Sequence, residues 1–110
     1  MLGSDPMNDI AFPKWKPRNS TLWHIDHTDT LTRRQAIRNA ASNFTKRKDV
    51  REALFRIKGD KCYICGNKAT QIDHKVSAYR YYIDDTLDIR TMNSLDNLFP
   101  ICRSCNAGKL

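Results

Sequence analysis

Four cysteines in two closely spaced pairs are the residues of this sequence best suited to bind a metal ion. Cys62 and Cys65 form one Cys-x-x-Cys pair, Cys102 and Cys105 form the other, and the chain has no fifth cysteine. Two such pairs supply the four thiolates of a tetrahedral structural zinc site, which leaves no coordination position open for catalysis. We therefore predict one zinc ion that stabilises the fold and takes no part in chemistry.

Disulfide bonds and an iron–sulfur cluster are the alternatives for these cysteines. Disulfides are disfavoured because the first thirty residues, interrupted by Asp, Pro, Lys and Arg, contain no export signal. A bond within a Cys-x-x-Cys pair would also close a small strained ring, and a thioredoxin-like redox site needs one such pair rather than two. An iron–sulfur cluster stays open as the minor alternative, since four thiolates also bind one.

An Asp-His pair follows the first cysteine pair and has the chemistry that hydrolysis of a phosphodiester requires. That reaction needs a base to take a proton from the attacking water, and a cation to stabilise the charge that develops on the leaving oxygen. His74 has an unperturbed pKa of about 6.5 and is therefore a base at pH 7. Asp73 offers a hard oxygen ligand for Mg²⁺. Because successive strand residues point to opposite faces, both serve one site only if the strand ends there.

The order of these residues resembles that of the HNH endonuclease family. The chain reads Cys62-x-x-Cys65-Gly66, then Ile72-Asp73-His74, then Asp96-Asn97-Leu98, then Cys102-x-x-Cys105-Asn106-x-x-Lys109. The resemblance covers residues from about 51 to 109, a little over half of the chain, with the four elements in the family's order. It implies a ββα-metal fold and metal-dependent cleavage of DNA.

The resemblance also implies a role for each matching residue. His74 corresponds to the general base, Asp73 to a metal ligand, and Asn97 to the Asn that ties the loop between the strands and helps to hold the base. Asn106 stands where the family often has His, and related nucleases with Asn at this place use its amide oxygen as the second metal ligand. Oxygen ligands favour Mg²⁺ or Mn²⁺ over Zn²⁺ in the active site. Lys109 corresponds to a basic residue near the scissile phosphate.

Basic residues are concentrated in one window of the chain. Residues 33–58 hold nine basic and two acidic residues, so this window carries a charge equal to the net +7 of the whole chain. Such a stretch is typical of proteins that bind the phosphate backbone of nucleic acids, although a solvated helix face has the same composition. We predict DNA contacts from this window, one tyrosine and the last lysine: Arg33, Arg34, Arg38, Lys46, Arg47, Lys48, Arg51, Tyr81 and Lys109.

Two further groups of side chains carry weaker signals. The tyrosines within residues 79–82 are suited either to stacking on bases or to packing in a core. The other group contains side chains that bind metals, but its spacing matches no metal-binding pattern and favours a polar loop: His24, Asp26, His27 and Asp29.

The spacing of apolar residues predicts the elements that must position these side chains. Two helices are expected within residues 31–58, each opened by a capping box, at Thr32 and at Asp49, and the second closed by Gly59. Short strands are expected at 69–74 and 98–101, joined by a long connection, and a final helix at 103–110.

These elements predict a small α+β protein with three regions. Residues 1–30 form an irregular N-terminal segment, of which residues 1–6 resemble a vector-derived leader before Met7. Residues 31–58 form the basic helical segment. Residues 59–110 form the zinc-stapled module, which the resemblance identifies as an HNH ββα-metal module.

Length and composition limit the function further. With 110 residues and 40% apolar content the chain fits one small domain, and its apolar runs are too short for a transmembrane helix. We expect a cytoplasmic protein with DNA and no membrane as partner, acting as a monomer or as a homodimer on DNA.

A zinc-knuckle module that only binds nucleic acid is the main alternative, but it has no use for Asp73, His74 and Asn106 together. A protein-interaction zinc domain would not need the basic window.

Overall fold

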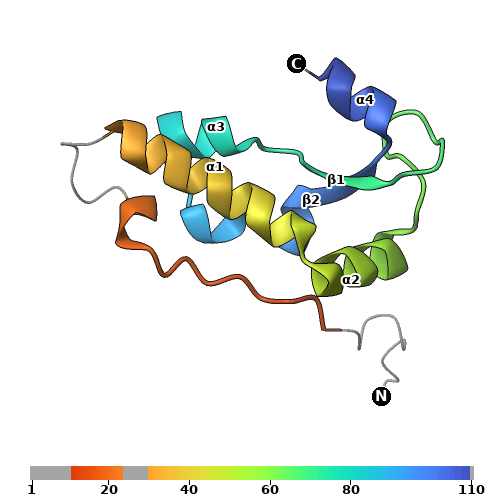
Figure 1. The fold of residues 1–110 in the computed structure, drawn as a ribbon, viewed down its shortest axis with the longest axis horizontal. Helices are drawn as coiled ribbons and strands as arrows, with labels where there is room; N and C mark the ends of the chain where they lie inside the picture. The colour runs from red at the N-terminus through yellow and green to blue at the C-terminus, as the bar shows by residue number, and fades with distance from the viewer. Residues whose placement is uncertain (1–10, 24–29, 110) are drawn as a thin grey trace.

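Helices and one pair of antiparallel strands make up the residues that the computed structural model describes, 11–23 and 30–109 (Figure 1). In chain order the elements are η1 (Ser20–Leu22), α1 (Thr30–Lys46), α2 (Lys48–Lys58), β1 (Gln71–His74), α3 (Ala78–Ile83), η2 (Ile89–Thr91), η3 (Leu95–Asn97), β2 (Leu98–Ile101) and α4 (Arg103–Gly108), where η marks a 3₁₀ helix. Gln71 of β1 pairs with Ile101 of β2, and His74 with Leu98. The fold is a small α+β arrangement, as predicted. The interpretations of residues 1–6 and of His24 to Asp29 fall outside the described residues.

A single extended residue separates α1 from α2. Arg47 has φ −66° and ψ 135°, which interrupts the helical run after Lys46 and allows the chain to change direction. Both helices then bury apolar side chains in one cluster with β2, which we call the junction cluster: Phe44, Val50, Leu54 and Leu98.

The ends of the helices differ from the capping boxes that the sequence predicts. α1 begins at Thr30, so that Thr32 lies inside its first turn. α2 has Arg47 as its N-cap residue, and Asp49 accepts two hydrogen bonds from the Arg47 guanidinium, at 3.0 and 2.7 Å. Gly59 closes α2 as predicted, with a φ of 85° that favours glycine.

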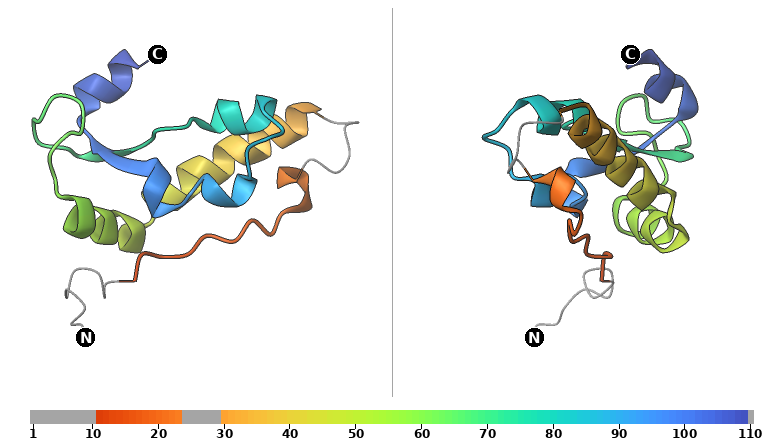
Figure 2. Two further views of the ribbon diagram at one scale, coloured as in Figure 1. Left: turned by 180° about the vertical axis from the view of Figure 1, so that it is seen from behind. Right: turned by 60° about the vertical axis from the view of Figure 1, so that its left-hand side comes forward.

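A second apolar cluster joins α1 to α3 and η2, and we call it the helical cluster. Its members are Leu22, Ile37, Ala41, Tyr81, Ile89 and Met92. Trp15, from the N-terminal segment, packs against both this cluster and the junction cluster. The two views in Figure 2 and that in Figure 1 show this segment running along the molecule beneath α1. Residues 11–23 are irregular as predicted, apart from η1, and they link the two clusters.

α3 is the helix that the sequence analysis did not predict. It has only six residues, too few to show a helical period, and three of them are tyrosines, which favour strands. The Ser77 hydroxyl accepts a hydrogen bond from the Arg80 N–H (3.2 Å), and Tyr81 fills the helical cluster, so a cap and one buried ring hold α3 in place. In the part of the chain that the structure describes, no helix combines the length and the apolar character needed to cross a membrane.

Candidate metal centre and adjoining polar cluster

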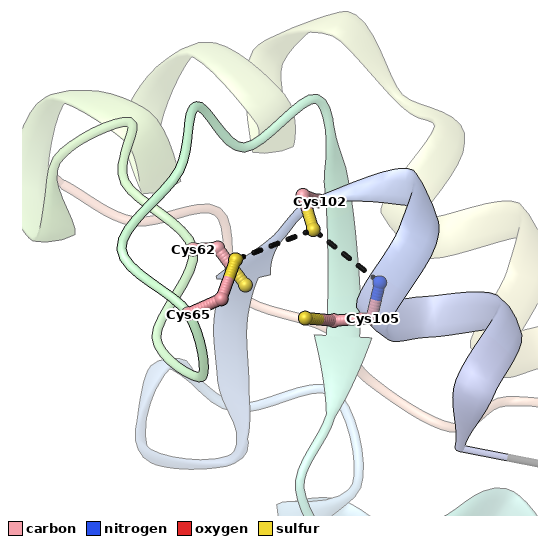
Figure 3. Close-up of side chains that lie close together, drawn as sticks. All are labelled: Cys62, Cys65, Cys102 and Cys105. Carbon is pink, nitrogen blue, oxygen red and sulfur yellow. Dashed lines mark hydrogen bonds between the residues drawn. The ribbon is translucent and has the colours of Figure 1, made fainter.

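The sulfur atoms of the two cysteine pairs lie together beside the sheet. Cys62 and Cys65 belong to the loop between α2 and β1, Cys102 is the N-cap residue of α4, and Cys105 lies within α4. All four Sγ atoms lie within 4.8 Å of one another, and those of Cys65 and Cys102 are 3.6 Å apart (Figure 3). Zinc–sulfur bonds of about 2.3 Å place tetrahedral sulfurs about 3.8 Å apart, so the four thiols fit a zinc ion.

Backbone geometry prepares both pairs for metal binding. Gly66 has a φ of 80°, and its N–H donates to the Cys62 carbonyl oxygen at 2.9 Å, which closes the first loop. The N–H groups of Ile64 and Cys105 donate to the sulfurs of Cys62 and Cys102, at 3.4 and 3.3 Å. Such hydrogen bonds favour the thiolate, which is the form that binds a metal.

The four thiols influence one another's ionisation. Burial acts to raise the pKa of the Cys62 thiol, but hydrogen bonds from backbone amides and from Cys65 outweigh it and lower this pKa to about 6. At Cys105 the hydrogen bonds with neighbouring sulfurs, that of Cys102 foremost, raise the pKa to about 12. Thiolates this close repel one another unless a cation neutralises them. A divalent ion is therefore the partner that suits this cluster.

α4 depends on this cluster because it has little apolar contact of its own. None of its side chains from Arg103 to Gly108 is buried. Within residues 11–23 and 30–109, the apolar cluster beside it contains Ile101 with Cys62 and Cys102, and Cys105 packs against this group. α4 is otherwise held by polar contacts with β1, of which one is a hydrogen bond from Asn106 Nδ2 to Gln71 Oε1 at 2.8 Å.

Asp73 of β1 contacts both a C-terminal residue and the loop that carries the first cysteine pair. It is only 9% exposed. The Tyr63 hydroxyl donates to its Oδ2 at 2.5 Å, and the Lys109 ammonium forms an ion pair with the same oxygen. Burial opposes a charge on Lys109, but hydrogen bonding and attraction to Asp73 outweigh burial and raise the pKa of Lys109. A charged lysine and a phenol therefore stand beside the Asp73 carboxylate.

His74 is the last residue of β1, and its ring contacts a different part of the chain. Its Nε2 lies 2.8 Å from Oδ1 of Asn93, and Asn93 Nδ2 donates to the Ala40 carbonyl oxygen in α1 at 3.3 Å. Because the Asn93 amide nitrogen is used by Ala40, its oxygen accepts from the ring, which leaves Nδ1 of His74 with the lone pair. Burial lowers the pKa of His74, against smaller opposing effects of Asn93 and Asp73. Burial therefore favours the neutral form of the His74 ring.

Asn97, assigned to the loop between the strands, bonds to backbone groups rather than to His74. Its Oδ1 accepts from the Val76 N–H at 2.7 Å, and its Nδ2 donates to the carbonyl oxygens of Val76 and Met92, at 3.0 and 2.9 Å. These bonds tie the residues that follow β1 to those that precede η3. The sequence analysis missed Asn93, the direct partner of His74, because two asparagines four residues apart give no signal that separates their roles.

The residues predicted to contact DNA divide into exposed and buried ones. Arg33 is 9% exposed and donates to the Tyr82 carbonyl oxygen at 3.1 Å, whereas Tyr81 is 5% exposed with its hydroxyl 2.8 Å from Thr91 Oγ1. Both side chains hold elements together and have little surface left for a nucleic acid. Arg51 is half-buried and donates to the Thr70 carbonyl oxygen at 2.6 Å. The others are exposed: Arg34, Arg38, Lys46, Arg47, Lys48 and Lys109.

The chain matches no protein-family model, no curated protein and no solved structure. The function of the site must therefore be argued from its own residues and their geometry.

The zinc assignment predicts that the pure protein holds one zinc ion per chain and that Cys102→Ser largely unfolds the C-terminal module. The reason is that α4 has almost no apolar contact to replace the metal, and metal binding is then coupled to folding. Elemental analysis and circular dichroism measure both effects. Ser104→Ala, an exposed position between the two cysteines of the same pair, is the matched control and should retain metal and fold. Folded wild-type protein with no bound metal would contradict the assignment.

Proposed function

We propose that this protein is an HNH-type endonuclease that hydrolyses DNA phosphodiester bonds with a divalent metal ion. The observation that carries the proposal is the state of His74 at the end of β1. Its Nε2 is paired with Asn93, and burial lowers its pKa, so the ring favours the neutral form with the lone pair on Nδ1. An immobilised neutral imidazole next to a buried carboxylate is the combination that general-base hydrolysis needs.

In this proposal different side chains of the protein transfer the proton, position the base and bind the DNA. His74 Nδ1 takes the proton from the attacking water while Asn93 holds the ring and its tautomer. Asn97 keeps the residues after β1 in place without touching the reacting atoms. The exposed arginines and lysines of α1 and α2 bind the DNA backbone and orient it.

Asp73 and Asn106 are the residues that would hold Mg²⁺ or Mn²⁺. Gln71 and Asp73 lie on one face of β1 and contact Asn106 and Lys109, so the carboxylate and the amide belong to the same contact between β1 and the C-terminal residues. Carboxylate and amide oxygens suit a hard cation, which would take the position at Asp73 that the Lys109 ammonium occupies in the ion pair. When bound, the metal supplies charge stabilisation for the leaving oxygen.

A non-catalytic zinc module that binds nucleic acid is the second candidate function. The ion pair between Lys109 and Asp73 favours it, because the lysine uses a carboxylate oxygen that a catalytic metal would require. In that case Asp73 only anchors the C-terminal residues, and His74 only packs the end of β1. Cleavage assays separate the two functions.

The nuclease proposal predicts that His74→Ala loses cleavage of supercoiled plasmid by about 10²–10⁴-fold, the usual effect of removing a general base. DNA affinity should stay close to that of wild type, because the imidazole acts on the water and adds little to ground-state binding. Plasmid nicking with Mg²⁺ or Mn²⁺ and DNA binding without them are the two measurements. Equal cutting by wild type and variant would assign the activity to another site or to a contaminant. A wild type that binds DNA and never cuts it would establish the binding module.

The cleavage rate should fall on acidification with a midpoint below pH 6.5, since burial lowers the pKa of His74 and the ring must be neutral to act. Asn93→Ala removes a hydrogen bond that raises this pKa, so the midpoint should move to still lower pH while the rate also falls. Asn97→Ala is the contrast: it leaves three backbone groups without partners and should lower the free energy of unfolding by about 1–3 kcal/mol with the pH midpoint unchanged. Identical pH profiles for Asn93→Ala and wild type would show that Asn93 does not influence the ionisation of His74 during cleavage.

DNA affinity should fall steeply with salt, because cations are released from each contacted phosphate. Changing Lys46, Arg47 and Lys48 to Gln should weaken binding to all DNA sequences. The slope of log affinity against log salt concentration should become shallower by up to about three. The matched control removes three exposed charges from the N-terminal segment, at Lys14, Lys16 and Arg18. If both triple variants bind alike, the basic junction of α1 and α2 is only a solvated surface.

A further inference from the structure

A groove between α1 and α3 combines arginine and tyrosine side chains and is used neither by the metal centre nor by His74. Its volume is about 390 Å³, within the roughly 300–1,000 Å³ of many ligand sites. Two arginines of α1 form one wall and two tyrosines of α3 form the other. The lining residues are Arg34, Arg38, Ser77, Ala78, Tyr79 and Tyr82.

Tyr79 of the groove is not needed to fill the core, although Tyr82 packs against the helical cluster. Tyr81 performs that task, buried in the helical cluster, whereas Tyr79 is 53% exposed and Tyr82 is only half-buried. The rings of Tyr79 and Tyr82 have centroids 6.3 Å apart and planes tilted by 47°, so they do not stack on each other. The exposed ring of Tyr79 therefore has surface left for a planar partner, whereas the Tyr82 ring already lies 5.9 Å from the guanidinium carbon of Arg33.

Positive charge lies directly against these rings. The guanidinium carbon of Arg34 is 5.3 Å from the centroid of the Tyr79 ring, and Arg38 is exposed on the same wall. Among the described residues no acidic side chain lines the groove, and Asp84, near the end of α3, lies 3.8 Å from the guanidinium of Arg80. Within the described residues, the groove thus presents aromatic surface together with arginines that no acidic lining residue neutralises.

An unpaired nucleotide has the matching chemistry. Its base offers a flat ring that stacks on tyrosine, and its phosphate pairs with guanidinium groups. In a duplex the faces of each base are covered by neighbouring bases, so duplex DNA can use only the arginines. An acidic peptide would likewise leave the rings without a partner. The combination therefore favours a single strand over both.

We propose that this groove binds an unpaired nucleotide of the DNA substrate, with the base on Tyr79 and the phosphate between Arg34 and Arg38. The proposal rests on the proposed nuclease function for the choice of DNA as the occupant. Ser77, which lines the groove, follows His74 by three residues, so the backbone of the groove begins within about 11 Å of the proposed base. The preferred substrate would be DNA with a single-stranded segment next to the scissile bond.

Fluorescence anisotropy with a labelled 12-nucleotide single strand and its duplex, without added divalent metal, tests the proposal. Tyr79→Ala should weaken single-strand binding by about 5- to 150-fold, the effect of losing one stacked base, and leave duplex binding nearly unchanged. Tyr79→Phe keeps the ring and should bind like wild type. Ile83→Ala, an exposed apolar residue of α3 outside the groove, and Arg56→Ala, an exposed arginine of α2, are the controls for folding and for charge.

Equal single-strand affinities of Tyr79→Ala and Ile83→Ala would overturn the proposal. It would also fall if Tyr79→Ala weakened duplex and single-strand binding alike, or if poly-glutamate displaced the single strand as well as unlabelled DNA does. The nuclease proposal is tested apart from this, because binding is measured without cleavage. If the protein binds the single strand through Tyr79 but does not cut DNA, only the nuclease proposal is contradicted. If it cuts DNA but shows no preference for single strands, only the groove proposal is contradicted.

Discussion

The gathering of four sulfur atoms is the constraint on which the C-terminal part of this structure depends. In the described part of the chain α4 buries no side chain, and the cluster beside it consists of one isoleucine, Ile101, with two of the cysteines. Burial of so few side chains contributes only a few kcal/mol, about 2 for one isoleucine, which is little to fix a helix. Cys102 and Cys105, tied to the loop that carries Cys62 and Cys65, set the position of α4 against β1. The contacts of Asn106 and Lys109 with β1 follow from that one arrangement.

β1 divides the molecule into two parts that are stabilised in different ways. Asp73 contacts the C-terminal residues, whose position depends on the sulfur cluster. His74 contacts Asn93, which is bonded to α1 and so belongs to the part held by apolar packing. The proposed base and the proposed metal ligand are adjacent in sequence but are supported from opposite sides. Loss of the sulfur cluster would affect the contact of Asp73 with Lys109, and loss of the packing around α1 would affect the contact of His74 with Asn93.

Several basic side chains serve the fold rather than a partner. Lys58 donates to the carbonyl oxygens of Leu95 and Leu98, at 2.5 and 2.7 Å, and lies 3.8 Å from the centre of the Phe99 ring. Burial lowers the pKa of Lys58, so this ammonium is held there at an electrostatic cost. Arg33 of α1 is buried and donates a hydrogen bond to the Tyr82 carbonyl oxygen in α3. Part of the basic window is thus internal support, and the surface that remains for a nucleic acid is correspondingly smaller.

The sequence by itself determined the cysteine pairs as a metal-binding set, the two basic helices, the returning strand at Leu98–Ile101 and the start of α4, because each rests on local spacing or local propensity. It did not reveal α3, whose six residues are too few to show a period and whose tyrosines favour strands. Only the tertiary structure decided that Asn93 and not Asn97 bonds to His74, that Arg33 and Tyr81 are buried, and that Lys109 pairs with Asp73. Each of these joins residues at least ten positions apart or depends on which side chains the core covers. Burial and long-range partners are properties of the packed chain, and no local pattern encodes them.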